Sequence, residues 1–201
     1  MTTTGAGSAG SGNGPTVEAT NRSGVSDIDT DRWARVAVET LMVEEVARGH
    51  LDLTFVDQAE MTELNETHMG HPGPTDVLSF PIDGESGAEG MAEVSPGDIT
   101  DDGEDVTDDG DPADPTGNIS LPLLLGDVVI CPQVAFEQAP DHCGDSDTEL
   151  TLLVVHGVLH VLGHDHREPG EEMAMVGRET EHLRRYGLIH PGPVGPESPR
   201  P

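Results

Sequence analysis

Lysine is absent from this chain of 201 residues, in which nine arginines face 39 acidic residues. The formal net charge is −30. So acidic a surface repels phosphate, which argues against a general affinity for nucleic acid. An RNA substrate would therefore need a local basic patch or high salt.

Cysteine is nearly absent as well. Cys131 and Cys143 are the only two, and neither belongs to a Cys-x-x-Cys pair, which excludes a disulfide framework and favours a reducing cytoplasm. No apolar run approaches the roughly 18 residues of a membrane span, and the N-terminus lacks the basic and apolar regions of a signal peptide. We expect a soluble cytoplasmic protein that does not bind membranes.

The length fits one folded domain with appendages. Residues 1–15 are of low complexity and almost without apolar side chains, which predicts a disordered tail. We assign the domain to residues 16–188, with an acidic disordered insertion at about 84–118, and a flexible tail to residues 189–201. A calcium loop is an alternative for the acidic stretch, but the spacing of an EF-hand is missing.

Apolar segments with strand and helix periodicity follow one another along the domain. We expect strands near 17–21, 51–56, 75–81 and 123–130, and helices near 31–48, 58–68, 132–139, 150–162 and 171–186. The Ser146-x-x-Glu149 pattern predicts a capping box ahead of the fourth helix. These elements predict a single α+β domain in which helices cover a small mixed sheet.

Four of the ten histidines lie in the segment His156–His166, HGVLHVLGHDH. His156 and His160 are four residues apart and so share one face of a helix, and Gly163 can end that helix. The chain can then bring His166 back as a third nitrogen ligand. A single histidine on an apolar face is more often a packed core residue, but three ligands with one open position are typical of a catalytic zinc centre. The spacing predicts one zinc ion per chain, on a central helix and the following turn.

The same segment matches the metzincin pattern H-E-x-x-H-x-x-G-x-x-H at every fixed position except one. Gly157 stands where a metalloprotease has its general base, a glutamate. Peptide hydrolysis needs such a base for its poor leaving group, whereas a metal ion can itself stabilise the charge that develops in phosphodiester cleavage. The sequence therefore favours hydrolysis of phosphodiesters over proteolysis.

His156–His166 resembles the signature H-G-x-L-H-x-x-G-[YH]-D-H of the YbeY family, bacterial metal-dependent endoribonucleases. Two further stretches resemble the family in its order: Pro74–Pro81, PTDVLSFP, and Leu125–Ile130, LGDVVI. The resemblance implies an α+β fold with zinc in a cleft and cleavage of single-stranded RNA. It further implies a role in finishing the 3′ end of 16S rRNA and in ribosome quality control, with rRNA and the small ribosomal subunit, not DNA, as partners.

By motif position, the resemblance makes His156, His160 and His166 the zinc ligands. We expect Asp165 either to orient a ligand imidazole or to make only a turn contact at the helix end. His164 fills a position where the family often has Tyr, so we expect it beside the site and not as a fourth ligand.

One departure from the family concerns RNA binding. Family members usually carry an Arg in the loop before the T-D-V-L-S-F strand, and Met69 takes its place here. His68 and His71 are candidate substitutes, although exposed histidines without a special task are the simpler interpretation. With the high acidity, this departure slightly favours the alternative of a non-catalytic ribosome assembly factor whose zinc stabilises the fold, although the endoribonuclease stays the preferred interpretation.

Overall fold

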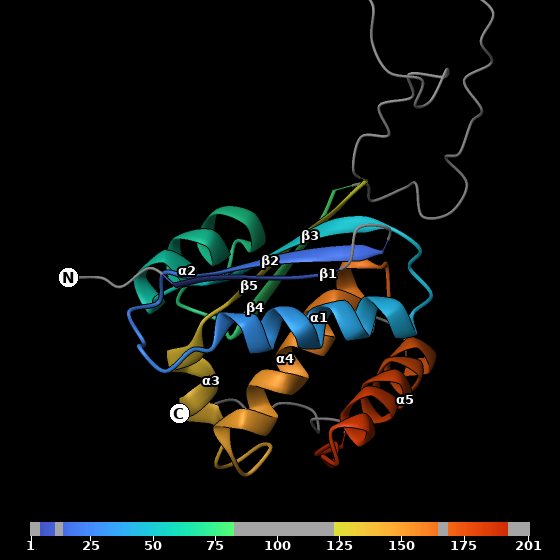
Figure 1. The fold of residues 1–201 in the computed structure, drawn as a ribbon. Helices are drawn as coiled ribbons and strands as arrows, with labels where there is room; N and C mark the ends of the chain where they lie inside the picture. The colour runs from blue at the N-terminus through green and yellow to red at the C-terminus, as the bar shows by residue number, and fades with distance from the viewer. Residues whose placement is uncertain (1–4, 11–13, 83–122, 165–168, 193–201) are drawn as a thin grey trace, which may run out of the picture.

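A five-stranded mixed sheet lies at the centre of the computed structural model, which describes residues 5–10, 14–82, 123–164 and 169–192. The strands are β1 (Gly5–Gly10), β2 (Pro15–Asn21), β3 (Gly49–Phe55), β4 (Val77–Pro81) and β5 (Leu124–Ile130). Their order is β1-β2-β3-β5-β4 (Figure 1). The three central strands are parallel, and β1 and β4 are antiparallel to their neighbours.

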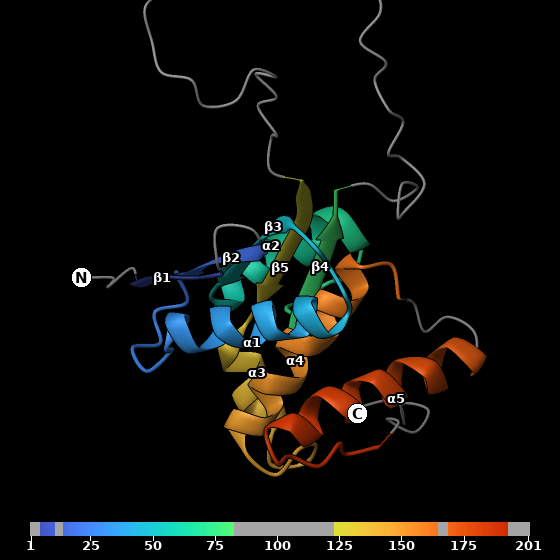
Figure 2. The same ribbon diagram turned by 45° about the vertical axis from the view of Figure 1, so that its right-hand side comes forward.

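Helices cover both faces of this sheet, but unequally. They are α1 (Thr30–Val43), α2 (Gln58–Leu64) with a following π-helical turn η1 (Asn65–Met69), α3 (Pro132–Gln138), α4 (Ser146–Val161) and α5 (Pro169–Arg185). In Figures 1 and 2, α1 and α4 lie along one face, α2 lies on the opposite side, and α5 packs on α4 away from the sheet. The prediction of a single α+β domain is confirmed. None of the described helices is long and apolar enough to span a membrane.

The predicted disordered tail is wrong for residues 5–10, which form β1 and pair with β2. Backbone hydrogen bonds to a neighbouring strand do not require apolar side chains, so a sequence of small residues can still join a sheet edge. Small residues are also needed here, because a Cβ on Gly7 would lie 2.6 Å from the backbone nitrogen of Asp31. Residues 1–4 and 11–13 of the predicted tail, the whole predicted acidic insertion and residues 193–201 lie outside the described residues.

Helix α4 is the buried centre of the helical layer. Its apolar residues surround the helix on all sides, and Val154, Val155, Val158 and Leu159 are wholly buried between the sheet, α1 and α5. Such an apolar helix is stable only in the interior of a protein. As predicted, the helix is followed by Gly163, whose φ of 88° is the left-handed conformation of a helix C-terminus.

The start of α4 differs from the predicted capping box. Asp145 is the N-cap, and its Oδ1 accepts hydrogen bonds from the backbone N–H groups of Asp147 at 3.0 Å and Thr148 at 2.9 Å. Aspartate at the N-cap satisfies the free N–H groups of the first turn as well as Ser146 would. The carboxylate of Glu149 is consequently not needed for capping and contacts His142 instead.

Gly157 brings α4 close to the sheet. A Cβ at this position would lie 2.5 Å from Cγ1 of Val128 on β5 and 3.3 Å from Oγ of Ser79 on β4. The Ser79 hydroxyl donates a hydrogen bond to the Gly157 carbonyl at 3.2 Å. Any side chain here would force the helix away from the strand, so this glycine is required for packing.

We predict that Gly157→Ala destabilises the protein by about 1–3 kcal/mol, the usual effect of overpacking a core. Gly177→Ala is the matched control, because Gly177 is also helical but a Cβ there meets nothing within 4 Å. Alanine at that exposed site should raise the free energy of unfolding by about 0.5–1 kcal/mol. Urea denaturation measures both changes, and equal effects of the two variants would contradict the packing argument.

Acidic side chains form a row across the face of the sheet opposite α4. Glu18, Asp52 and Asp127 are aligned in register on β2, β3 and β5. Burial raises the pKa of Asp127, and the charge of Asp52 raises it further, against an opposing contribution from His50. The ionised form of Asp127 is therefore disfavoured in the folded state.

A carboxyl group whose pKa is raised in the folded state favours folding at low pH, where it is protonated. This contribution to stability is lost as the pH rises above about 4, the ordinary pKa of aspartate. We predict that Asp127→Asn raises the free energy of unfolding at pH 7 by a few tenths to about 1 kcal/mol, and the melting temperature with it. The gain should shrink toward pH 4. Thermal denaturation from pH 4 to 8 tests this. The exposed Asp141→Asn variant is the control, and a gain independent of pH would refute the explanation.

Candidate functional site

His156 and His160 lie one turn apart on α4 and face each other. Their Nε2 atoms are 3.1 Å apart, and their ring centroids are 4.5 Å apart with planes inclined by 80°. Both residues are only partly buried although the neighbouring apolar residues of α4 are buried. The predicted placement of the two imidazoles on one helix face is confirmed.

The hydrogen bonding of His156 determines which of its nitrogens can accept. Its Nδ1 lies 2.6 Å from Oε1 of Glu179, so this nitrogen carries the hydrogen and donates it to the carboxylate. When the ring is neutral, its Nε2 presents a lone pair toward His160. Two zinc-bound nitrogens at about 2.0 Å and tetrahedral angles would be about 3.3 Å apart. The two rings therefore fit a shared zinc ion.

Glu179 comes from α5 and was not found from the sequence. It is 4% exposed, and its second oxygen, Oε2, accepts from Nε2 of His190 at 2.7 Å. Burial alone would raise its pKa, but hydrogen bonds and charges from His156 and His190 outweigh this and hold the pKa below its ordinary value. A carboxylate that orients a metal-binding imidazole is a regular feature of zinc sites. The sequence did contain a signal for this residue, because Glu179 shares a helical spacing with apolar residues. The buried stripe of α5 consists of Met175, Glu179, His182 and Leu183.

The turn after α4 is described only as far as His164. Nε2 of His164 lies 3.5 Å from Oε2 of Glu44, whose carboxylate also contacts Arg178 and, at 2.9 Å, Nε2 of His182. His164 thus joins a group of polar side chains around Glu44, which follows α1, with Arg178 and His182 of α5. Asp165 and His166 lie outside the described residues, so the third ligand and the role of Asp165 stay predictions.

A cavity of about 360 Å³ opens beside His156. Four carboxylates line it, those of Asp76, Glu149, Glu172 and Glu179. Neither His68 nor His71 belongs to its lining; both are exposed, and the ring of His68 packs edge-on against Phe80 at 5.0 Å. Met69, at the place of the usual arginine, is 44% exposed. Within the described residues, the cavity therefore carries no arginine to hold phosphate.

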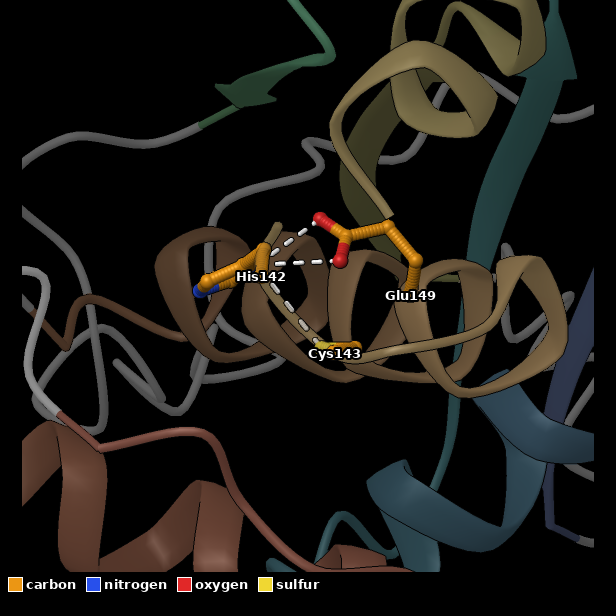
Figure 3. Close-up of side chains that lie close together, drawn as sticks. All are labelled: His142, Cys143 and Glu149. Carbon is orange, nitrogen blue, oxygen red and sulfur yellow. Dashed lines mark hydrogen bonds and ion pairs between the residues drawn. The ribbon is translucent and has the colours of Figure 1, made fainter. Parts of the chain in front are cut away.

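Sequence reasoning also missed a second group of polar side chains at the same cavity. His142 and Cys143 in the loop after α3 meet Glu149 in the first turn of α4 (Figure 3). Their nitrogen, sulfur and carboxylate oxygen atoms lie within 4.8 Å of one another. Cys143 stands alone in the sequence, without the paired spacing that signals a metal ligand, so only the folded loop brings this group together.

Comparison with known proteins assigns the family. Residues 18–187 match the family described as Endoribonuclease YbeY. A protein of that name from Salinispora tropica is 41% identical over 173 residues, 85% of this chain and 95% of the relative. Another from Acidothermus cellulolyticus is 42% identical over 175 residues, 85% of this chain and 91% of the relative. A solution structure of a Thermotoga maritima protein shows a TM-score of 0.46 at 19% identity, covering 80% of this chain and 88% of that one.

The chain belongs to the YbeY family, and the resemblance predicted from its three motifs is confirmed. Its curated relatives are named as endoribonucleases, a class of hydrolase that cuts phosphodiester bonds within RNA.

Proposed function

We propose that this chain is a zinc-dependent endoribonuclease that cleaves single-stranded RNA in the maturation of the 3′ end of 16S rRNA and in ribosome quality control. The observation that carries the proposal is the pair of facing Nε2 atoms of His156 and His160, with the His156 ring fixed by Glu179, in a chain whose relatives are named endoribonucleases. Its partners are then rRNA and the small ribosomal subunit, and its location is the cytoplasm.

Each residue of the site has a distinct part. His156, His160 and, by motif position, His166 hold the zinc ion. A zinc ion held there would act as a Lewis acid toward a phosphoryl oxygen and would lower the pKa of a bound water toward 7. Glu179 keeps the hydrogen of His156 on Nδ1 and so keeps Nε2 available as a donor atom.

Gly157 separates this chemistry from proteolysis. In a metalloprotease of the matching pattern, the residue after the first histidine supplies the base that takes the proton of the attacking water. Here a Cβ at that position would point at Val128 of the sheet. The packing of α4 thus leaves no room for a base at this position, which supports phosphodiester cleavage.

We predict that Glu179→Gln weakens zinc binding about 10- to 100-fold, the usual effect of losing a carboxylate partner of a zinc-binding histidine. Glu181→Gln on the exposed face of the same helix is the matched control and should bind zinc as the wild type does. Competition with a coloured chelator measures both affinities. Equal affinities of the two variants would remove Glu179 from the site.

The activity itself is tested with a labelled 16S rRNA precursor and zinc-loaded protein. We expect cuts in single-stranded RNA that increase with salt, because salt screens repulsion between the phosphates and the acidic chain. His160→Ala, checked for folding by circular dichroism, should reduce cleavage at least 100-fold. Control His68→Ala removes an exposed histidine outside the cavity and should cleave at close to the wild-type rate.

Two results would count against this function. Intact precursor at every salt concentration, with zinc bound, would refute cleavage of this substrate. Rescue of a deletion strain by folded His160→Ala would instead favour the non-catalytic assembly factor, which the acidic cavity and Met69 make the second candidate.

A further inference from the structure

The side chains of His142, Cys143 and Glu149 converge on one point at the start of α4. Nδ1 of His142 is 3.0 Å from Oε1 and 2.9 Å from Oε2 of Glu149, and the Sγ of Cys143 is 3.7 Å from the same Nδ1. Figure 3 shows that the three interactions meet at one end of the imidazole. The three donor atoms lie within 4.8 Å of one another, close enough together to hold one metal ion.

Burial makes this convergence energetically demanding. Glu149 is 0% exposed, and a buried carboxylate needs a counter-charge or strong hydrogen bonds. The acidic side chains of Asp145 and Asp147 lie in the same turn and add negative charge. Lysine is absent from the chain, and Arg32 forms its ion pair with the carboxylate of Asp147 in this turn. The site therefore favours a cation.

The arrangement does not suit a cysteine nucleophile. In a catalytic cysteine–histidine–acid relay, the sulfur and the carboxylate contact opposite nitrogens of the imidazole. Here both contact Nδ1. Burial and the neighbouring Glu149 also raise the pKa of the Cys143 thiol far above its usual range, the opposite of what a reactive thiolate requires.

The separation of the sulfur and nitrogen atoms suits a tetrahedral metal ion. Zinc bonds of about 2.3 Å to sulfur and 2.0 Å to nitrogen at tetrahedral angles separate the two atoms by about 3.5 Å. The observed separation of Sγ and Nδ1 is 3.7 Å. Thiolate with imidazole selects zinc over magnesium or calcium, which prefer oxygen ligands.

We propose that His142, Cys143 and Glu149 form a second zinc site, distinct from the two facing histidines of the same helix. Glu149 and His156 both line the cavity and are seven residues apart on one face of α4, a separation of about 10 Å along the helix axis. That is much longer than the 3.5–4 Å of two-metal catalysis. The second ion fastens the loop between α3 and α4 to the central helix, and its binding releases the thiol proton of Cys143.

Cobalt(II) provides the sharpest test, because a thiolate ligand gives it a charge-transfer band in the near ultraviolet and a site made of histidines does not. Metal-stripped full-length protein titrated with Co²⁺ should develop this band, and Zn²⁺, but not Mg²⁺, should abolish it. The band should be lost in Cys143→Ser. It should be kept in Cys131→Ser, the matched control, which changes the buried cysteine at the N-cap of α3. A double variant, His156→Ala with His160→Ala, should keep the band while binding one equivalent less.

Stability supplies a second measurement. Zn²⁺ should raise the melting temperature of the double histidine variant, and adding Glu149→Gln, close in shape to the native side chain, should weaken this zinc binding at least 10-fold. The site is refuted if the wild type gives no band or if folded Cys143→Ser keeps it. His50→Ala breaks a second, more exposed group of possible ligands, Glu18, His50 and Asp52. Loss of the band in this variant would also refute the site. Failure of rRNA cleavage alone would leave the cobalt result unchanged, so the two proposals are tested separately.

Discussion

The close contact between α4 and β5 at Gly157 is the constraint on which the rest of this structure depends. Without a side chain between them, the helix packs directly on Val128, and its apolar residues become the core of the whole helical layer. A helix held this tightly has little freedom to rotate. The imidazole of His156, which lines the cavity, and that of His160 are therefore presented together by a rigid element, as a metal site requires.

Buried carboxylates hold several histidine side chains in place around α4 and α5. Glu179 from α5 fixes one imidazole, and Glu149 on α4 binds His142 from the preceding loop. Helix α5 is held by a third such contact, in which Glu44 after α1 meets Arg178 and His182. Each of these three carboxylates has an imidazole partner, so carboxylates inside the fold serve to position histidines.

Local patterns were sufficient to predict most elements and the placement of His156 and His160 on one helix face. The spacing of His156 and His160 and the helix-ending Gly163 depend on helical geometry alone, which the sequence displays directly. Edge strand β1 could not be predicted, because Gly5–Gly10 joins the sheet through its backbone and not through its side chains. The cap of α4 was misplaced by one residue, because Asp145 and Ser146 are both good N-caps and only the loop geometry chooses between them.

The sequence by itself determined the family, the two-histidine helix face and the missing protease base, because these follow from residue identity and spacing along one element. Only the tertiary structure decided which side chains from other elements contact α4. Glu179 arrives 23 residues after His156, and His142 and Cys143 arrive through the fold of a loop. It also showed why residue 157 is glycine, since the distance between a helix and a strand is a property of packing that no spacing along the chain reveals.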